Sequence, residues 1–370
     1  MKVPQFEPYL GNEEYEAIRD CFDKNWITEG PKAKEFNKEL CEFIGCKYGI
    51  FAPNGTLALY LGLRAIGIRQ GDEVIVPDST FIASATSVEM VGATPVFVDV
   101  NRDNFQIDIR DCHRVLTDKT KAIMPVHLYG QSANMTDIMN FANENSLLVI
   151  EDAAQVLGVR WKGKHCGTFG QVGCFSFFAD KTITTGEGGL VITNDEQYYD
   201  KLLYYRNQGR KQRGSFIHPE IGYNFRMTDM QMAVGLVQLG KFNEIATKKI
   251  NIRNKYEELL KDIPQVKFTT VDENSGYIPF RVTLMCEKAH PLMDFIASKD
   301  IEMRTFFYPL HKQPCFEYLK KQPHYERMND EFFPNAIYGF ENGVCLPSFA
   351  ALTEEQIEYV CENIKQFYNT

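Results

Sequence analysis

Hydrophobic and polar positions along the chain predict short strands that alternate with helices. In residues 12–24 and 33–45, apolar residues recur every three or four positions. This spacing places them on one face of a helix and indicates amphipathic helices. Between residues 46 and 195, short β-like apolar runs alternate with further helical runs. The predicted strands are 48–53, 72–77, 94–100, 120–128, 146–152, 172–178 and 188–194, and the predicted helices between them are 56–67, 84–92 and 135–146.

This order of elements predicts an α/β fold with a mostly parallel central sheet sandwiched by helices. Residues 229–260 have the pattern of one long helix or two, and residues 278–308 suggest a βαβ-like remainder. We therefore expect a large unit over residues 1–245 and a small C-terminal α+β unit over 246–370. In such sheets ligands bind beyond the carboxyl ends of the strands, so we expect the functional residues at those ends.

Composition narrows the class of protein. The 370 residues are 44% hydrophobic and 24% charged, and the net charge of −9 argues against nucleic acid or an anionic membrane as the main partner. No apolar run reaches the roughly 18 residues of a membrane helix. Ten cysteines without a C-x-x-C pair argue against zinc, and we expect no metal. The N-terminus lacks a signal-peptide core, so we expect a cytoplasmic protein with free thiols.

Three predicted strand ends carry residues suited to a phosphorylated cofactor. Lys181 lies between an apolar strand and a glycine-rich turn, as either a reactive amine or a solvated loop lysine. Asp152 ends the strand over 146–152, where a carboxylate needs a positive or hydrogen-bonding partner; a structural salt bridge or a helix cap is the alternative. Residues 54–56, Asn-Gly-Thr, open a helix whose free N–H groups favour an anion, or they form a plain N-cap.

Together these three features suit pyridoxal phosphate. This cofactor needs a lysine for its Schiff base, an acid for its pyridinium nitrogen and a cup for its phosphate. Phe81 could stack on the ring or be a core aromatic, and Ser176 could reach the phosphate or bond to backbone. His127 could contact the ring or the substrate, or it could be structural. A nicotinamide dehydrogenase is disfavoured because its glycine fingerprint is missing.

Longer stretches of the chain resemble a known family. EDAAQ (151–155), CFSFFADKTITTGEGG (174–189) and GYNFRMTDMQMAVGLVQL (222–239) closely resemble the DegT/DnrJ/EryC1/StrS family of sugar aminotransferases. The resemblance extends from FEPYLGNEE and WITEGPKAKEF through PNGTLAL and VDVNRDNFQID to TFFYPLHKQP and CLPS. It implies the aspartate-aminotransferase-like fold, type I among pyridoxal-phosphate enzymes. KTITTGEGG and RTFFYPLH are most similar to the GDP-perosamine synthase branch.

The resemblance also implies roles for individual residues. Lys181 matches the lysine of the internal aldimine, Asp152 the acid that pairs with the pyridine nitrogen, and Gln155 the residue beside the ring and its phenolic oxygen. Phe81 occupies the stacking position. Asn224 matches a residue that reaches the phosphate from the neighbouring subunit, which implies a homodimer with shared active sites. The phosphate cup matches Gly55, Thr56 and Ser176.

The activity that the resemblance implies is transfer of the amino group of L-glutamate to C4 of a nucleotide-linked 4-keto-6-deoxy sugar, through pyridoxamine phosphate. Such amino sugars usually enter surface polysaccharides or glycosylated natural products. A dTDP- or UDP-linked keto sugar, attack at C3, a small keto phosphate and a non-catalytic regulatory protein stay open. Asp180 departs from the usual uncharged residue; it could raise the pKa of the lysine or point outward. Candidate substrate contacts, each with packing or a salt bridge as the alternative, are Trp26, Thr28, His127, Arg226, Tyr308 and His311.

Overall fold

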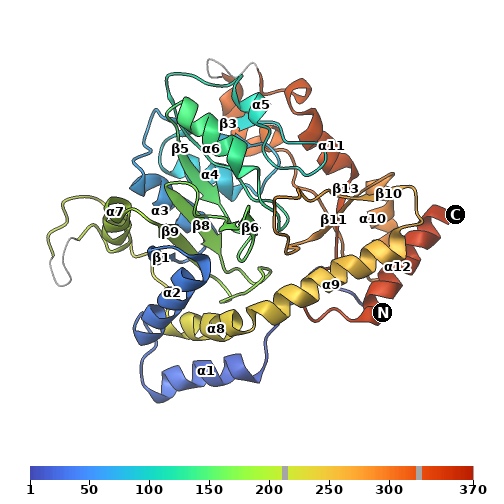
Figure 1. The fold of residues 1–370 in the computed structure, drawn as a ribbon, viewed down its shortest axis with the longest axis horizontal. Coiled ribbons are helices and arrows are strands. Elements are labelled where there is room, and N and C mark those ends of the chain that lie inside the picture. The colour runs from blue at the N-terminus through green and yellow to red at the C-terminus, as the bar shows by residue number, and fades with distance from the viewer. Residues whose placement is uncertain (211–215, 322–326, 370) are drawn as a thin grey trace.

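A seven-stranded sheet forms the centre of the protein (Figure 1). The computed structural model describes residues 1–210, 216–321 and 327–369. The strand order is β1-β9-β8-β5-β4-β2-β3, and β9 runs antiparallel to both neighbours while the other pairs are parallel. This confirms the predicted α/β fold with a mostly parallel sheet. The strands are β1 (Tyr48–Ala52), β2 (Glu73–Pro77), β3 (Thr94–Val98), β4 (Thr120–Ile123), β5 (Leu148–Asp152), β8 (Val172–Ser176) and β9 (Gly189–Thr193).

Helices cover both faces of this sheet because successive strand residues point to opposite sides. Ile50 packs on the face that carries α3 (Gly55–Ala65), α4 (Ala83–Met90) and α7 (Glu196–Arg206). Phe51, the next residue, packs on the opposite face. That face carries α2 (Pro31–Ile44), α6 (Met135–Glu144) and α8 (Asp229–Gly240), with α1 (Asn12–Asp23) packed on α8. Both faces are therefore buried, as the near-continuous apolar strands require.

A second, smaller sheet lies at the far end of α9 (Phe242–Leu260), as Figure 1 shows. It is antiparallel, in the order β10-β11-β13-β12. Its strands are β10 (Val266–Phe268), β11 (Val282–Cys286), β12 (Arg304–Thr305) and β13 (Gly343–Leu346), and its helices are α10 (Ala289–Ala297), α11 (Pro334–Asn342) and α12 (Glu354–Asn369). The short remaining elements are α5 (Ile109–Cys112), β6 (Arg160–Trp161), β7 (Lys164–His165), η1 (Leu310–Lys312), η2 (Pro314–Lys321) and η4 (Asp330–Phe332).

The long helical pattern resolves into two helices that join the two sheets. α8 ends at Gly240 and α9 begins at Phe242. Along α9, Ile245 packs with the large-sheet core and Ile252 with the small-sheet core, so the change of partner occurs within one continuous helix. The division at residue 245 stays a prediction. Val3 forms a bridge with Ile301 and packs with the small sheet, although we grouped the N-terminal segment with the large unit.

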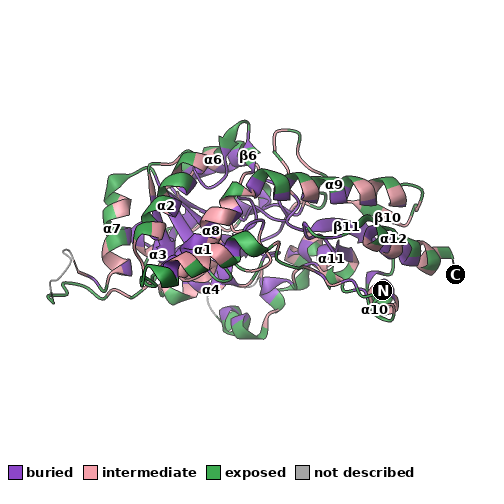
Figure 2. Cartoon of the chain, turned by 90° about the horizontal axis from the view of Figure 1, so that it is seen from below, coloured by how far each residue is buried: buried purple, intermediate pink, exposed green. Residues whose placement is uncertain are grey.

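Figure 2 shows the helical surface that encloses these two cores from below. α9 is buried along one side and exposed along the other, as expected for a helix that lies across both cores. Within the described ranges, no helix combines the length and the apolar character needed to cross a membrane.

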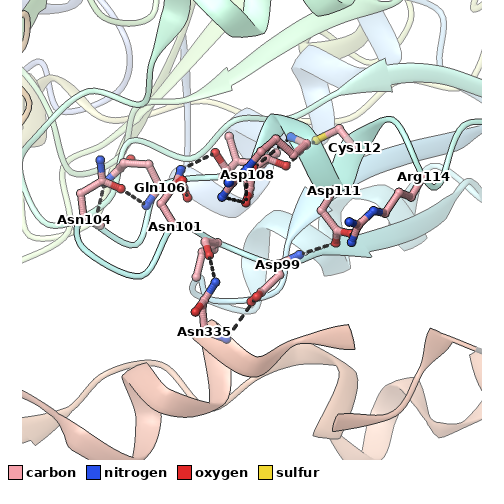
Figure 3. A network of polar contacts seen from close by, with 12 residues as sticks. Asp99, Asn101, Asn104, Gln106, Asp108, Asp111, Cys112, Arg114 and Asn335 are labelled. Carbon is pink, nitrogen blue, oxygen red and sulfur yellow. Dashed lines mark hydrogen bonds and ion pairs between the residues drawn. The ribbon is translucent and has the colours of Figure 1, made fainter. Parts of the chain in front are cut away.

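A polar network also ties the small unit to the loop after β3 (Figure 3). The Asp99 carboxylate accepts hydrogen bonds from the backbone N–H groups of Asn335 (3.1 Å) and Ala336 (2.9 Å), at the start of α11. The Asp99 N–H in turn donates to Asp111 at 2.9 Å. Asp99 is thus an N-cap supplied by a distant segment, and it helps to fix the position of α11.

Some elements were missed because their patterns are weak. The strand expected over 120–128 ends at Ile123, since Pro125 cannot continue the ladder, and Val126 forms only a single bridge with Asp152. α7 was missed because only Leu202 and Arg206 of its residues are buried, which leaves no apolar stripe. β13, α11 and α12 were also not predicted.

The start of α2 depends on a carboxylate from α8, and this gives a stability prediction. Asp229 is 2% exposed, and its oxygens accept from the N–H groups of Gly30 (2.8 Å), Ala33 (3.0 Å) and Lys32 (3.1 Å). Asp229→Ala should lower the free energy of unfolding by about 2–4 kcal/mol, because it leaves these donors without a partner. Urea unfolding measures it, with the half-exposed Asp20→Ala as control, expected within about 0.5 kcal/mol. Equal effects of both substitutions would contradict the prediction.

Candidate active site

Lys181 lies in the turn after β8, at the carboxyl edge of the large sheet. Its backbone N–H donates to the carbonyl of Phe178 at 3.0 Å. Its side chain is only 15% exposed; Nζ lies 3.7 Å from Oδ1 of Asp180 and 4.3 Å from the ring centroid of Phe280. Burial lowers the pKa of Lys181, while Asp180 and Asp152 raise it. This environment does not fit the alternative of a solvated loop lysine.

Asp152 ends β5, the strand beside β8. Its side chain accepts from Ser84 Oγ at 2.8 Å and from the Ala154 N–H at 3.2 Å, and the residue is 6% exposed. Burial raises the pKa of the Asp152 carboxyl; the two hydrogen bonds and the charge of Lys181 oppose this shift. A cation placed against Asp152 would therefore favour its ionised form, which is the environment that a protonated pyridine nitrogen needs.

The start of α3 forms a close cradle with the end of β8. Asn54 caps the helix by accepting from the Leu57 N–H at 3.0 Å, so the predicted N-cap is present. A Cβ on Gly55 would lie 2.9 Å from Cβ of Ser176, too close for a side chain. The first-turn N–H groups of Gly55 and Thr56 thus open beside the Ser176 hydroxyl, the arrangement that binds a phosphate.

The other predicted cofactor residues occupy three further places. Oε1 of Gln155, which is 7% exposed, accepts from the Tyr129 N–H at 2.7 Å. Phe81 follows β2; it is 56% exposed, and its ring centroid lies 6.2 Å from that of Phe307. Asn224 is exposed and bridges to Asn207 in the chain that follows α7. The connection that follows α7 extends beyond the body of the molecule in Figure 1 and Figure 2.

Two of the predicted substrate residues share a large cleft. Trp26 and Arg226 line a cavity of about 1390 Å³ beside α2 and α7. Arg226 Nε lies 3.6 Å from Glu29 Oε2, so the salt-bridge alternative is present there. The carbonyl of Thr28 accepts from the Asp229 N–H at 3.3 Å. Tyr308 lies elsewhere, 39% exposed and 5.0 Å from the Phe340 ring centroid.

His127 takes the structural alternative rather than a substrate contact. It is fully buried, and its Nδ1 accepts from the Ala133 N–H at 3.0 Å. Since Nδ1 is an acceptor, Nε2 carries the proton and donates to Glu151 Oε2 at 3.0 Å. Both ring nitrogens are thereby satisfied inside the protein, and we withdraw His127 as a substrate contact.

His311 is likewise tied to protein groups. Its Nδ1 lies 2.7 Å from Asp78 Oδ2 and its Nε2 3.2 Å from Asp330 Oδ1. The ring is 2% exposed and stacks on Phe333 at 4.2 Å between centroids. These contacts fix the loop after β12 against the end of β2, so the predicted substrate role of His311 is also withdrawn.

Four residues around Lys181 and Asp152 were not singled out from the sequence: Ser84, Lys249, Phe280 and Arg281. Arg281 Nη2 donates to Asp180 Oδ2 at 2.6 Å, so Asp180 points inward rather than to solvent. The available signal was a charge within an apolar pattern. Arg281 interrupts the run at 278–285, and Lys249 shares the buried side of α9 with Ile245 and Ile252.

The fold and this constellation define a pyridoxal-phosphate aminotransferase. The chain belongs to the DegT/DnrJ/EryC1/StrS aminotransferase family, whose profile matches residues 8–365, and this confirms the predicted family and cofactor. It is 39% identical over 370 residues to GDP-perosamine synthase of Escherichia coli O157:H7, with 99% of each chain covered. It is 37% identical over 372 residues to GDP-perosamine synthase of Vibrio cholerae, again with 99% of each covered.

A solved structure agrees with this assignment. S. venezuelae DesV, in complex with a ketimine intermediate, has a TM-score of 0.92 and 28% identity to the chain, covering 100% of this chain and 99% of that one. The predicted type I aminotransferase fold is therefore confirmed, and the residues described above supply a lysine, an acid and a phosphate cradle that fit its cofactor.

Lys249 gives a prediction on the pH dependence of stability. The residue is 4% exposed, and its Nζ donates to the carbonyls of Ser348 (3.0 Å) and Phe280 (3.4 Å). Burial lowers the pKa of Lys249 to about 7 from 10.5, with a further contribution from Arg281. Between these two values the unfolded chain binds a proton that the folded chain lacks, so this position adds stability as pH rises.

The difference in unfolding free energy between the wild type and Lys249→Met should therefore rise with pH, by about 1.4 kcal/mol per unit from pH 7 to 10. Below pH 7 the difference should be constant. Urea unfolding across this range measures it, with the exposed Lys267→Met as the matched control. A difference that stays flat between pH 7 and 10 would rule out the buried neutral amine.

Proposed function

We propose that the protein transfers the amino group of L-glutamate to C4 of a nucleotide-linked 4-keto-6-deoxy sugar, as a GDP-perosamine synthase. The observation that carries the aminotransferase chemistry is the placement of a largely buried lysine, Lys181, and a buried acid, Asp152, at the ends of adjacent strands. The two GDP-perosamine synthases at 37–39% identity support the sugar and the GDP base. dTDP- or UDP-linked sugars, C3 and a keto phosphate are the competing substrates.

The residues of the site suit each part of this chemistry. Bound pyridoxal phosphate supplies an electron sink for the carbanion formed at the donor carbon. Lys181 is the group that moves the proton, because burial lowers its pKa and so favours the free amine that can act as a base. Asp152 keeps the ring nitrogen protonated, and Gly55, Thr56 and Ser176 hold the phosphate. We keep Gln155 beside the ring and Phe81 over it.

A homodimer is part of this proposal. Asn224 is exposed, and it lies in a segment that projects past α7 with the large apolar side chains Phe216 (86% exposed) and Ile221 (75% exposed). Such side chains favour burial against another chain. We propose that Asn224 reaches the phosphate held by a second copy, and that Trp26 and Arg226, in the cleft beside this segment, contact the nucleotide sugar. The cytoplasm is the proposed compartment, because all ten cysteines are free.

A regulatory protein without catalysis is the weaker candidate. Binding alone would not require a lysine buried between an acid and an aromatic ring, as Lys181 is between Asp180 and Phe280. Turnover with glutamate separates the two functions, because a regulator would bind cofactor or sugar without forming an amino sugar.

Lys181→Ala should abolish turnover, with a loss of at least about 10³-fold, because no other residue replaces its proton transfer. The assay is mass detection of amino-sugar product from GDP-, dTDP- and UDP-4-keto-6-deoxy sugars with L-glutamate. We expect product chiefly from the GDP sugar. Lys181→Arg, which keeps the charge but forms no Schiff base, should be equally inactive. Substantial activity of either variant would refute the role of Lys181.

Mixing two inactive variants tests the shared site. Lys181→Ala and Asn224→Ala should each be nearly inactive, but hybrid dimers hold one site with both substitutions and one with neither. After random reassortment from an equal mixture, about a quarter of wild-type activity should return. No recovery, with hybrid dimers demonstrated by native mass spectrometry, would place Asn224 in the same subunit as Lys181.

A further inference from the structure

Two pairs of adjacent residues face each other where the two sheets meet. Asp180 and Lys181 follow β8 of the large sheet, and Phe280 and Arg281 precede β11 of the small sheet. Arg281 Nη2 lies 2.6 Å from Asp180 Oδ2, and Lys181 Nζ lies 4.3 Å from the Phe280 ring centroid. Each residue of one pair thus contacts one residue of the other.

The Asp180 carboxylate is held at only one of its two oxygens. Oδ2 is paired with Arg281, and the side chains of Asp180 and Arg281 are 9% and 7% exposed. Oδ1 is buried without a hydrogen-bond partner among the described residues, and it lies 3.7 Å from Lys181 Nζ. A buried carboxylate oxygen without a donor is unfavourable, so its orientation toward the lysine needs an explanation.

The backbone around Arg281 is itself held by a third basic side chain. Lys249 on α9 donates to the carbonyl of Phe280 at 3.4 Å and to that of Ser348 at 3.0 Å. The guanidinium of Arg281 also lies 4.8 Å from the Phe280 ring centroid. Arg281 therefore approaches Asp180 from a braced segment, and Asp180 cannot turn away from Lys181 without breaking a buried ion pair.

We propose that Asp180, anchored by Arg281, is a positioning residue that holds the Lys181 ammonium through its unpartnered oxygen whenever the lysine is not bonded to the cofactor. This inference rests on the proposed role of Lys181 as the amine that binds the cofactor. The freed lysine must stay close enough to take and return a proton, and a charged acceptor at a fixed place keeps it there.

The charges around Lys181 determine in which direction each substitution should shift its deprotonation. Asp180 and Asp152 favour its protonated form, whereas burial and Arg281 disfavour it; Lys249 faces the same cluster from α9. Removing the negative charge of Asp180 should therefore make Lys181 lose its proton at lower pH. Removing the positive charge of Arg281 should have the opposite effect, because it also frees Asp180 to interact with the lysine alone.

The experiment measures the protonation of Lys181 in the full-length, cofactor-free protein. Trace acetylation with acetic anhydride across a pH series, read by mass spectrometry of the peptide that contains Lys181, gives the midpoint of deprotonation. Asp180→Asn should lower this midpoint by about one pH unit or more, and Arg281→Gln should raise it. Glu187→Gln removes an exposed carboxylate from the same turn and should leave the midpoint unchanged.

An unchanged midpoint in Asp180→Asn, in protein with native circular dichroism, overturns the proposal, as does an equal shift in Glu187→Gln. Unfolding would raise the midpoint toward that of an ordinary lysine, opposite to the expected shift. If Asp180→Asn does not fold, Arg281→Gln decides, and an unchanged midpoint in that folded variant overturns the proposal. The assay uses no glutamate or sugar, so failure of the proposed substrate would leave its result intact.

Discussion

The cost of burying several ionisable groups at one edge of a sheet is the constraint on which this structure depends. A buried carboxylate or ammonium costs several kcal/mol unless it is paired, roughly in proportion to the water it loses. Lys181, Asp180, Arg281 and Lys249 all lie at this edge with side chains almost removed from solvent. Each therefore needs partners, and those partners come from both sheets. The same burial makes Lys181 reactive, because it weakens the hold of the amine on its proton.

The requirement for partners explains why the small unit is part of the active site and not an appendage. The large sheet supplies Lys181 and Asp152, but the groups around the lysine amine include Phe280 and Arg281, which directly precede β11 of the small sheet. α9 carries the chain between the two cores, and Lys249 on that helix donates to the carbonyls of Phe280 and Ser348, which flank the paired ends of β11 and β13. A movement of the small unit would therefore change the surroundings of Lys181, because it would displace Arg281, which anchors Asp180.

The sequence predicted most of the large unit because its signals are local. Apolar runs of four or five residues marked the buried parallel strands, and their carboxyl ends gave Asp152 and Lys181 before any resemblance was considered. In the small unit, β11 and β12 fall within the predicted βαβ-like segment, whereas β10 and β13 were not recognised. Arg281 could not be predicted as a partner of Asp180, because the residues are far apart in sequence and the contact exists only after both sheets have formed. A contact between residues of the two sheets leaves no periodic pattern of apolar residues in the sequence.

The strand pattern at Glu151 and Asp152 shows which of two neighbouring acids can serve the ligand site. Consecutive strand residues point to opposite faces, so the two carboxylates diverge although both are buried. Asp152 accepts a hydrogen bond from Ser84, and the charge of Lys181 acts on its carboxylate. Glu151 faces the other layer, where one side chain and three backbone N–H groups satisfy it at 2.6–3.0 Å: His127, Gly167, Phe169 and Gly170. A carboxylate so fully bonded has no capacity left for a ligand. Of these two acids, only Asp152 can still bind a ligand. His127 has a structural role because it is hydrogen-bonded to Glu151.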